Sequence, residues 1–355
     1  MAGPEPFETI SSLARQLDDR RVSSRELVED SIVRIERLNP VLNAVISLDK
    51  LGAVAAADQA DKARAHGAVS PLLGVPMLHK DIFCTRGIRT SCASKMLEDF
   101  VPPYDATVVR KLHDAGMISL GKCNMDEFAM GSSNETSFFG AVKNPWDVNR
   151  VPGGSSGGSA VALATGMMPL ASGSDYGGSL RTPAGFCGVV GIRPSPGVVA
   201  AEGRPVGLLP FSVLGPMGRT VDDAYLLLQA QMGVDPHDPF STSPDVDLFA
   251  PLEAADLGSI RAMITPDLGG APMSKSYRSI FVKRVETFSR YFASAENGAP
   301  DFTDVDNCFE VLRGVNFVAA HGERVRMHRD KLSPNVVDNV DRGLAYSLED
   351  VAIAH

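Results

Sequence analysis

One stretch of the chain combines two glycine-flanked serines with a long run that carries no ionisable side chain. Residues 151–181 read VPGGSSGGSAVALATGMMPLASGSDYGGSLR, and Ser155 and Ser179 each lie within a glycine-rich tract. No side chain between positions 151 and 174 can ionise, which favours burial. Gly166 and Pro169 interrupt the run, so it predicts a buried loop, helix and strand rather than a membrane-spanning helix.

Helical and strand-like segments alternate along most of the chain. A capping box at Ser23–Glu26 predicts a helix that ends at Pro40, and an alanine-rich helix is expected over 51–66. Strands are expected at 75–78, 117–120 and 169–172, with helices at 105–115 and 159–168. This alternation is typical of an α/β sandwich.

Composition excludes some classes of function. The chain of 355 residues has a net charge of −9 and a pI near 5.3, which argues against direct nucleic-acid binding through overall charge. The five cysteines form no C-x-x-C pair, so neither a zinc site nor a disulfide framework is indicated. The first ten residues, MAGPEPFETI, lack the pattern of a signal peptide. We therefore expect a cytoplasmic protein without a metal and without a membrane segment.

A lysine upstream of the two serines suggests a proton relay. A serine hydroxyl is a poor nucleophile until a neighbouring base takes its proton. Lys80 lies at the end of an apolar strand in the segment GVPMLHKD, where desolvation would lower its pKa toward neutrality. Its neighbour Asp81 should point to the opposite face of that strand, so the two are not expected to pair.

Three other interpretations of the first glycine tract fit less well. A flexible linker would lie between domains, whereas this tract lies between apolar segments. The G-x-S-x-G pattern centred on Ser156 is typical of a nucleophile elbow, but the polar, proline-broken segment 144–152 replaces the strand that an elbow requires. A phosphate-binding loop would need a Gly-Lys-Ser/Thr sequence after the glycines, and none follows.

Two motifs resemble those of a known enzyme family. Residues 153–194 resemble the defining signature of the amidase signature family of serine amide hydrolases, and residues 74–81 resemble its lysine motif. The resemblance extends to about Gly233 and more loosely beyond. It implies an α/β fold with a central mixed β-sheet covered by helices on both faces. It also implies hydrolysis of a small carboxamide through an acyl-enzyme, with no cofactor.

The resemblance also assigns roles to individual residues. It makes Ser179 the nucleophile, Ser155 the bridging serine that follows a cis peptide bond, and Lys80 the base. It implies an oxyanion hole built from the turn Tyr176, Gly177, Gly178 and Ser179, supported by Asp175 and Arg181. Substrate-binding residues are expected at Met130, Gly131 and Ser132.

The two halves of the chain resemble different subfamilies. The segment 84–109 and the segment 121–147 resemble the A subunits of glutamyl/aspartyl-tRNA amidotransferases, which implies glutamine hydrolysis and a tRNA-binding partner subunit. In the second half, Tyr176 replaces the usual threonine and Arg193 lies in place of a lysine, as in stand-alone amidases. Both activities therefore stay open, as does a homo-oligomeric state.

The end of the chain differs from the family pattern. We expect a single amidase-signature domain over 1–355, with a core at 1–232, a loop or linker at 233–258, and a helical, incomplete part at 259–355. The family normally continues with further helices and strands beyond the position of His355. A truncated or mosaic fragment without activity is therefore a third alternative.

Overall fold

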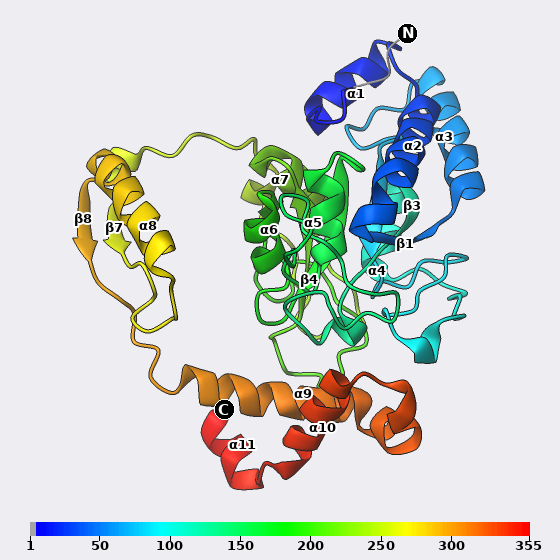
Figure 1. Ribbon diagram of the computed structural model, residues 1–355. Helices are drawn as coiled ribbons and strands as arrows, with labels where there is room; N and C mark the ends of the chain where they lie inside the picture. Colours follow the sequence, from blue (N-terminus) through cyan, green and yellow to red (C-terminus); the bar gives the residue numbers. More distant parts are fainter. Residues whose placement is uncertain (1–4) are drawn as a thin grey trace. The chain divides into compact units, whose positions relative to one another are not determined.

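The computed structural model describes residues 5–355, which form two compact units (Figure 1). The first unit contains the residues up to Phe249 together with Asn316–Leu344, and the second contains Ala250–Val315 and Ala345–His355. The sequence was expected to form one domain over 1–355. The chain leaves the first unit after Phe249 and returns to it at Asn316, and the single amidase-signature domain stays a prediction.

A mixed β-sheet forms the centre of the first unit. Within the described residues its strand order is β1-β3-β2-β4-β6-β5. The strands are β1 (Val45–Leu48), β2 (Pro76–Lys80), β3 (Ile118–Cys123), β4 (Leu170–Asp175), β5 (Val190–Gly191) and β6 (Val213–Gly218). Strand β2 runs parallel to both β3 and β4, whereas the other pairs are antiparallel. The predicted central mixed sheet is therefore confirmed.

Helices cover both faces of this sheet. Met77 and Leu170 pack in one apolar cluster with α1 (Ile10–Asp18), α4 (Thr107–Asp114) and α7 (Val221–Gln231). Leu78 and Ala171 pack in a second cluster with α2 (Ser24–Leu42), α3 (Lys50–Ala65) and α5 (Gly157–Ala164). Consecutive strand residues point to opposite faces, so these neighbouring pairs anchor the two layers. No helix in residues 5–355 is both long enough and apolar enough to span a membrane.

Helix α2 begins as the sequence predicts but ends later. The Ser23 hydroxyl accepts from the Glu26 N–H, and the Glu26 carboxylate accepts from the Ser23 N–H, which confirms the capping box. The expected end at Pro40 is wrong, since α2 continues to Leu42. Asn43, with a left-handed φ of 51°, ends the helix instead.

The returning segment completes the first unit. It consists of the second part of α9 (Val305–His328) and most of α10 (Pro334–Ala345). Phe317, Val336 and Val340 are buried there in one apolar cluster with Phe128 and Met130. The Ser333 N–H donates to the Glu127 carboxylate at 2.8 Å, which fixes this segment over residues 127–130.

The second unit contains a small parallel sheet that the sequence did not predict. Strands β7 (Arg261–Ile264) and β8 (Ser294–Asn297) pair in parallel, connected through α8 (Lys275–Phe288), and α11 (Leu348–Ala354) lies near the end of the chain. The part expected to be helical over 259–355 therefore contains a small sheet as well as its helices. The segment expected to be a loop or linker, 233–258, belongs in part to the first unit, which extends to Phe249. Within that unit, Asp238 accepts from the Arg204 guanidinium at 2.9 Å.

Candidate active site

Lys80 is the last residue of β2, and its ammonium group is fully buried. Its Nζ atom donates to Ser155 Oγ at 2.7 Å and to Ser174 Oγ at 2.9 Å. The parallel pairing of β2 with β4 places Leu78 opposite Ala171, which brings the ends of the two strands together. The fold therefore delivers a lysine and two serine hydroxyls to one buried point.

Burial changes the acid–base behaviour of Lys80. Desolvation of the ammonium lowers its pKa from 10.5 to about 7, although the negative charges of Asp126 and Asp175 oppose the shift. A substantial fraction of Lys80 is therefore neutral at neutral pH. A neutral amine can accept a proton, as a general base must.

Asp81 lies away from Lys80, in agreement with the strand geometry. Its carboxylate accepts from the Ser91 hydroxyl at 2.5 Å and from the Ala93 N–H at 3.0 Å. Burial raises the pKa of Asp81, whereas the Ser91 hydrogen bond and the nearby Lys122 lower it. Asp81 therefore organises the loop that follows β2, and it does not neutralise Lys80 by a direct contact.

Ser155 lies in the loop that precedes α5 and is fully buried. The peptide bond between Gly154 and Ser155 is cis, as expected. A Cβ atom at Gly154 would lie 2.3 Å from the Asp126 carboxylate, so only glycine fits before this serine. The next N–H, of Ser156, donates to the Ser179 carbonyl at 3.3 Å and joins the two glycine tracts.

Ser179 lies on a tight turn between β4 and α6 (Arg181–Cys187), and 9% of its surface is exposed to solvent. The Asp175 carboxylate accepts from the N–H groups of Gly178 at 2.8 Å and Leu180 at 3.1 Å, which closes the turn. Gly178 has a φ of +116°, a conformation that side-chain-bearing residues rarely adopt. Because the Gly178 N–H already donates to Asp175, it is not free to bind an oxyanion in this structure. The oxyanion hole expected at residues 176–179 stays a prediction.

Two arginines bind the carboxylate that supports this turn. Arg181 Nε donates to Asp175 at 3.1 Å, and Arg193 donates to the same carboxylate at 2.8 Å. Burial by itself would raise the pKa of Asp175, but the hydrogen bonds from Arg181 and from the turn N–H groups lower it to about 2. Asp175 therefore stays ionised and the turn stays closed across the pH range in which Lys80 titrates.

Sequence reasoning missed Ser174 and Arg193 as parts of this site. In the sequence, Ser174 is one of two serines in strand β4, and nothing there distinguished it from Ser172. Arg193 was noted as a departure from a subfamily pattern, but no sequence signal indicated that it reaches Asp175, 18 residues earlier in the chain.

The expected substrate-binding residues lie beside α10. Met130 is buried, and its carbonyl accepts from the Asn335 side chain. Gly131 is half-buried and Ser132 is exposed. A Cβ atom at Gly131 would lie 2.4 Å from the Asp126 side chain, so this segment packs closely on the carboxylate whose charge acts on Lys80. The substrate-binding role of these three residues stays a prediction.

The site contains no cluster typical of a metal centre. Among residues 5–355, no group of three or more His, Cys, Asp and Glu side chains is arranged to hold a metal ion. The arrangement can supply a nucleophilic hydroxyl, a relay hydroxyl and a base of suitable pKa.

A comparison with family models matches residues 26–343 to the amidase family. The chain belongs to that family. The membership agrees with the resemblance of both glycine tracts and of the lysine motif. It also agrees with the α/β fold described above.

Relatives of this chain include curated proteins and solved structures. The chain is 50% identical over 266 residues to the A subunit of the glutamyl-tRNA(Gln) amidotransferase from Azoarcus sp. (strain BH72), covering 75% of this chain and 52% of the relative. The chain thus spans about half the length of this curated relative.

Two solved structures share the fold closely. A bacterial aryl acylamidase of the amidase signature family has a TM-score of 0.89 at 25% identity, covering 98% of this chain and 74% of that one. The A subunit of the glutamyl-tRNA(Gln) amidotransferase from Thermotoga maritima has a TM-score of 0.76 at 30% identity, covering 98% of this chain and 74% of that one.

Proposed function

We propose that this chain hydrolyses the amide bond of a small carboxamide through an acyl-enzyme on Ser179. The observation that carries the proposal is the fully buried Lys80, whose Nζ lies 2.7 Å from Ser155 Oγ and whose pKa burial lowers to about 7. A buried lysine costs stability, and this one lies where a serine relay needs a base. Family membership supports the same chemistry.

In the proposed first step, the Ser179 oxygen forms a bond to the amide carbon. Its proton passes to Ser155, whose own proton passes to neutral Lys80. The resulting ammonium returns a proton through Ser155 to the leaving nitrogen as the C–N bond breaks. Water then attacks the ester, losing a proton to the same relay, and releases the acid and Ser179. Every proton taken up by Lys80 is returned, so no cofactor is required.

Backbone N–H groups would stabilise the oxyanion that forms in both steps. The N–H groups of Gly177 and Ser179 are the proposed donors to this oxyanion, and a contribution from the Tyr176 N–H stays an expectation. Removing one oxyanion donor typically costs about 2.7–4 kcal/mol of transition-state stabilisation. Asp175 and its two arginines support the proposed donors by holding the turn closed.

Covalent labelling tests the proposal directly. A fluorophosphonate reacts with activated serines, so we expect the folded chain to be labelled and Ser179→Ala to lose the label. Ser156→Ala is the matched control, because Ser156 is also buried and glycine-flanked but its hydroxyl donates to the Ser174 carbonyl. A folded parent chain that never reacts would support the third alternative, an inactive fragment.

A second candidate function is the glutaminase activity of an amidotransferase A subunit. The observation that favours it is the 50% identity to a protein of that name. In this proposal the chain releases ammonia from glutamine in the cytoplasm and passes it to a tRNA-binding partner subunit. Ammonia release from glutamine, measured with and without the partner subunits of a related amidotransferase, separates the two candidates. Stimulation by the partner favours the second, and equal, partner-independent hydrolysis of other amides favours the first.

A further inference from the structure

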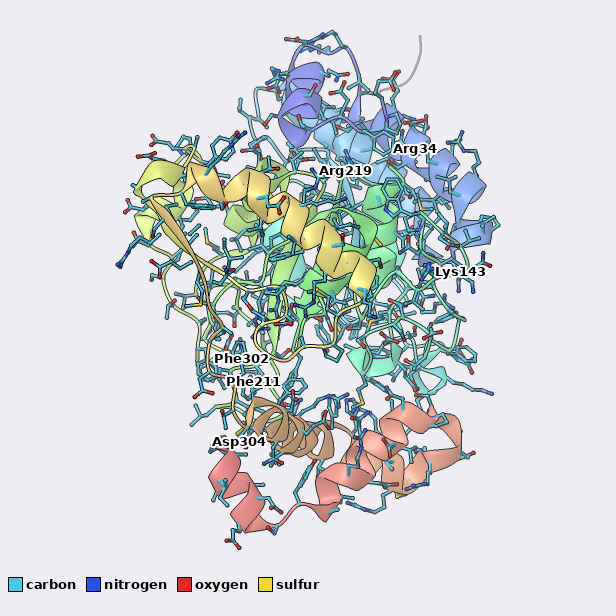
Figure 2. The ribbon with its side chains drawn as sticks, turned by 60° about the vertical axis from the view of Figure 1, so that its left-hand side comes forward. Arg34, Lys143, Phe211, Arg219, Phe302 and Asp304 are labelled. Atoms are coloured by element: carbon cyan, nitrogen blue, oxygen red, sulfur yellow. The ribbon has the colours of Figure 1, made fainter. Side chains whose placement is uncertain are left out.

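Aromatic side chains gather beside the turn that carries Ser179. Tyr176 lies three residues before Ser179, and its ring centroid is 5.6 Å from that of Phe211 and 6.2 Å from that of Phe317. Phe211 is half-buried on the loop before β6 and is labelled in Figure 2. Phe317 is buried in α9. We call these three residues the aromatic wall.

A single guanidinium group fixes part of the wall to the turn. Arg193 Nη1 donates to the Asp175 carbonyl at 2.6 Å and to its carboxylate at 2.8 Å, while Nη2 donates to the Phe211 carbonyl at 2.9 Å. The loop of Phe211 and the turn of Ser179 are therefore held together by one rigid, planar donor.

The wall adjoins a buried apolar cluster that includes Met130 of the expected substrate-binding segment. Phe317 belongs to the same buried cluster as Phe128 and Met130. The Phe128 ring also contacts the tilted ring of His321, at 4.6 Å between centroids. Burial lowers the pKa of His321 to about 4, so that neighbour is neutral at neutral pH. The cluster between Tyr176 and Met130 is thus largely apolar, although the Arg324 guanidinium lies 5.4 Å from the Phe128 ring centroid.

Carboxylates near the turn already have partners within the protein. Asp175 accepts from two arginines and two backbone N–H groups. Asp126 accepts from the N–H of Asn134 at 3.0 Å and from the Thr136 hydroxyl at 3.0 Å. Glu127 accepts from the Ser94 hydroxyl at 2.6 Å and from Ser333. The α-ammonium group of an amino-acid amide would compete with these donors for the carboxylate oxygens.

We propose that the aromatic wall selects carboxamides whose acyl group carries a flat, uncharged ring, in preference to α-amino-acid amides such as glutamine. This inference rests on the proposed amidase function. A planar ring can stack on the wall, whereas a charged amino-acid head would lose hydration there and recover only part of it as a cation–π contact. Tyr176 is the specificity-determining residue, since it belongs to both the turn and the wall.

Matched substrates and variants of the full 355-residue chain test this inference. Ammonia release is measured with 3-phenylpropanamide, with 3-cyclohexylpropanamide, which has similar size without a flat ring, and with glutamine. We expect the highest kcat/KM for the phenyl substrate. Tyr176→Thr should lower that value by about three- to tenfold, the usual worth of a ring contact, while Tyr176→Phe retains the preference. Phe138→Leu, at an exposed ring, is the remote control.

A second readout does not depend on turnover. The rates of covalent inactivation by a phenylethyl and a cyclohexylethyl phosphonofluoridate report the same preference at Ser179. Labelling with no phenyl preference, or a preference unaffected by Tyr176→Thr, overturns the inference and leaves the amidase proposal in place. Preferred hydrolysis of glutamine does the same. A chain that neither reacts with the phosphonofluoridates nor releases ammonia refutes the amidase proposal, and the inference with it.

Discussion

Replacing Lys80 by methionine should make the protein more stable at neutral pH and also inactive. Methionine is similar in length to lysine but carries no charge. In the folded state, burial lowers the pKa of Lys80 from 10.5 to about 7. Below pH 7 the folded protein therefore bears the full penalty of a buried ammonium, about 4–5 kcal/mol. The penalty falls as pH rises from 7 to 10.5, because the folded protein has already released this proton while the unfolded chain still holds it.

The expected net gain is smaller than this penalty. Methionine leaves the hydroxyls of Ser155 and Ser174 without the ammonium that they accept from, at a cost of about 1–3 kcal/mol. We therefore expect Lys80→Met to raise the free energy of unfolding by about 1–3 kcal/mol at pH 7. The change with pH is the more direct prediction: the difference from the parent should shrink by about 3 kcal/mol between pH 7 and pH 9.5.

Urea unfolding followed by tryptophan fluorescence measures this effect in the right part of the molecule. The chain has one tryptophan, and Trp146 lies in the first unit, where its indole N–H donates to the Cys187 carbonyl at 2.9 Å. Lys143→Met is the matched control, because Lys143 is exposed in the same unit (Figure 2). Its ammonium stays in water in both states. If Lys80→Met and its parent differ equally at both pH values, the reasoning about Lys80 is refuted.

Three further predictions concern the same site. Activity should depend on the neutral form of Lys80, so kcat/KM should rise about tenfold from pH 6 to pH 8 and then level off; a profile that is flat over this range would exclude Lys80 as the base. Ser174→Ala removes an acceptor of the Lys80 ammonium, so the midpoint of that rise should move to lower pH in a pH–rate titration, and an unmoved midpoint would show that the contact is unimportant. Gly178→Ala should lower the free energy of unfolding by about 1–2 kcal/mol and reduce activity, since φ is +116° and the new Cβ would lie 2.9 Å from the Thr182 hydroxyl. Gly185→Ala in α6, where no atom lies within 4 Å of a new Cβ, should instead be neutral or stabilising by up to about 1 kcal/mol in the same urea experiment.

The sequence predicted the layers of the fold because they depend on local patterns. Alternating apolar segments and a capping box at Ser23 indicated the strands and helices, and the cis bond before Ser155 followed from the family resemblance. The strands β7 and β8 were missed because RAMI and SAEN carry little of the β-branched, alternating pattern of buried strands. A division into two units was missed because it depends on where residues after Asn316 pack.

The candidate site was predicted only as far as its motifs extend. Ser155 and Lys80 were expected to meet, and their side chains do form a hydrogen bond. The contact with Ser174 depends on the pairing of β2 with β4, a long-range choice that periodicity does not encode. The reach of Arg193 to both Asp175 and Phe211 depends on a loop conformation that no turn motif specified.

The return of the chain to its first unit has a consequence for folding during synthesis. Glu127 is synthesised long before Ser333, its partner 206 residues later in the sequence. At a translation rate of about 5–20 residues per second, this interval lasts about 10–40 s. During most of that time the ribosome holds a nascent chain whose two glycine tracts are complete but whose Phe128–Met130 segment lacks its apolar cover. A chaperone that binds exposed aromatic and methionine side chains could bind Phe128 and Met130 until the covering residues 317–340 have been synthesised.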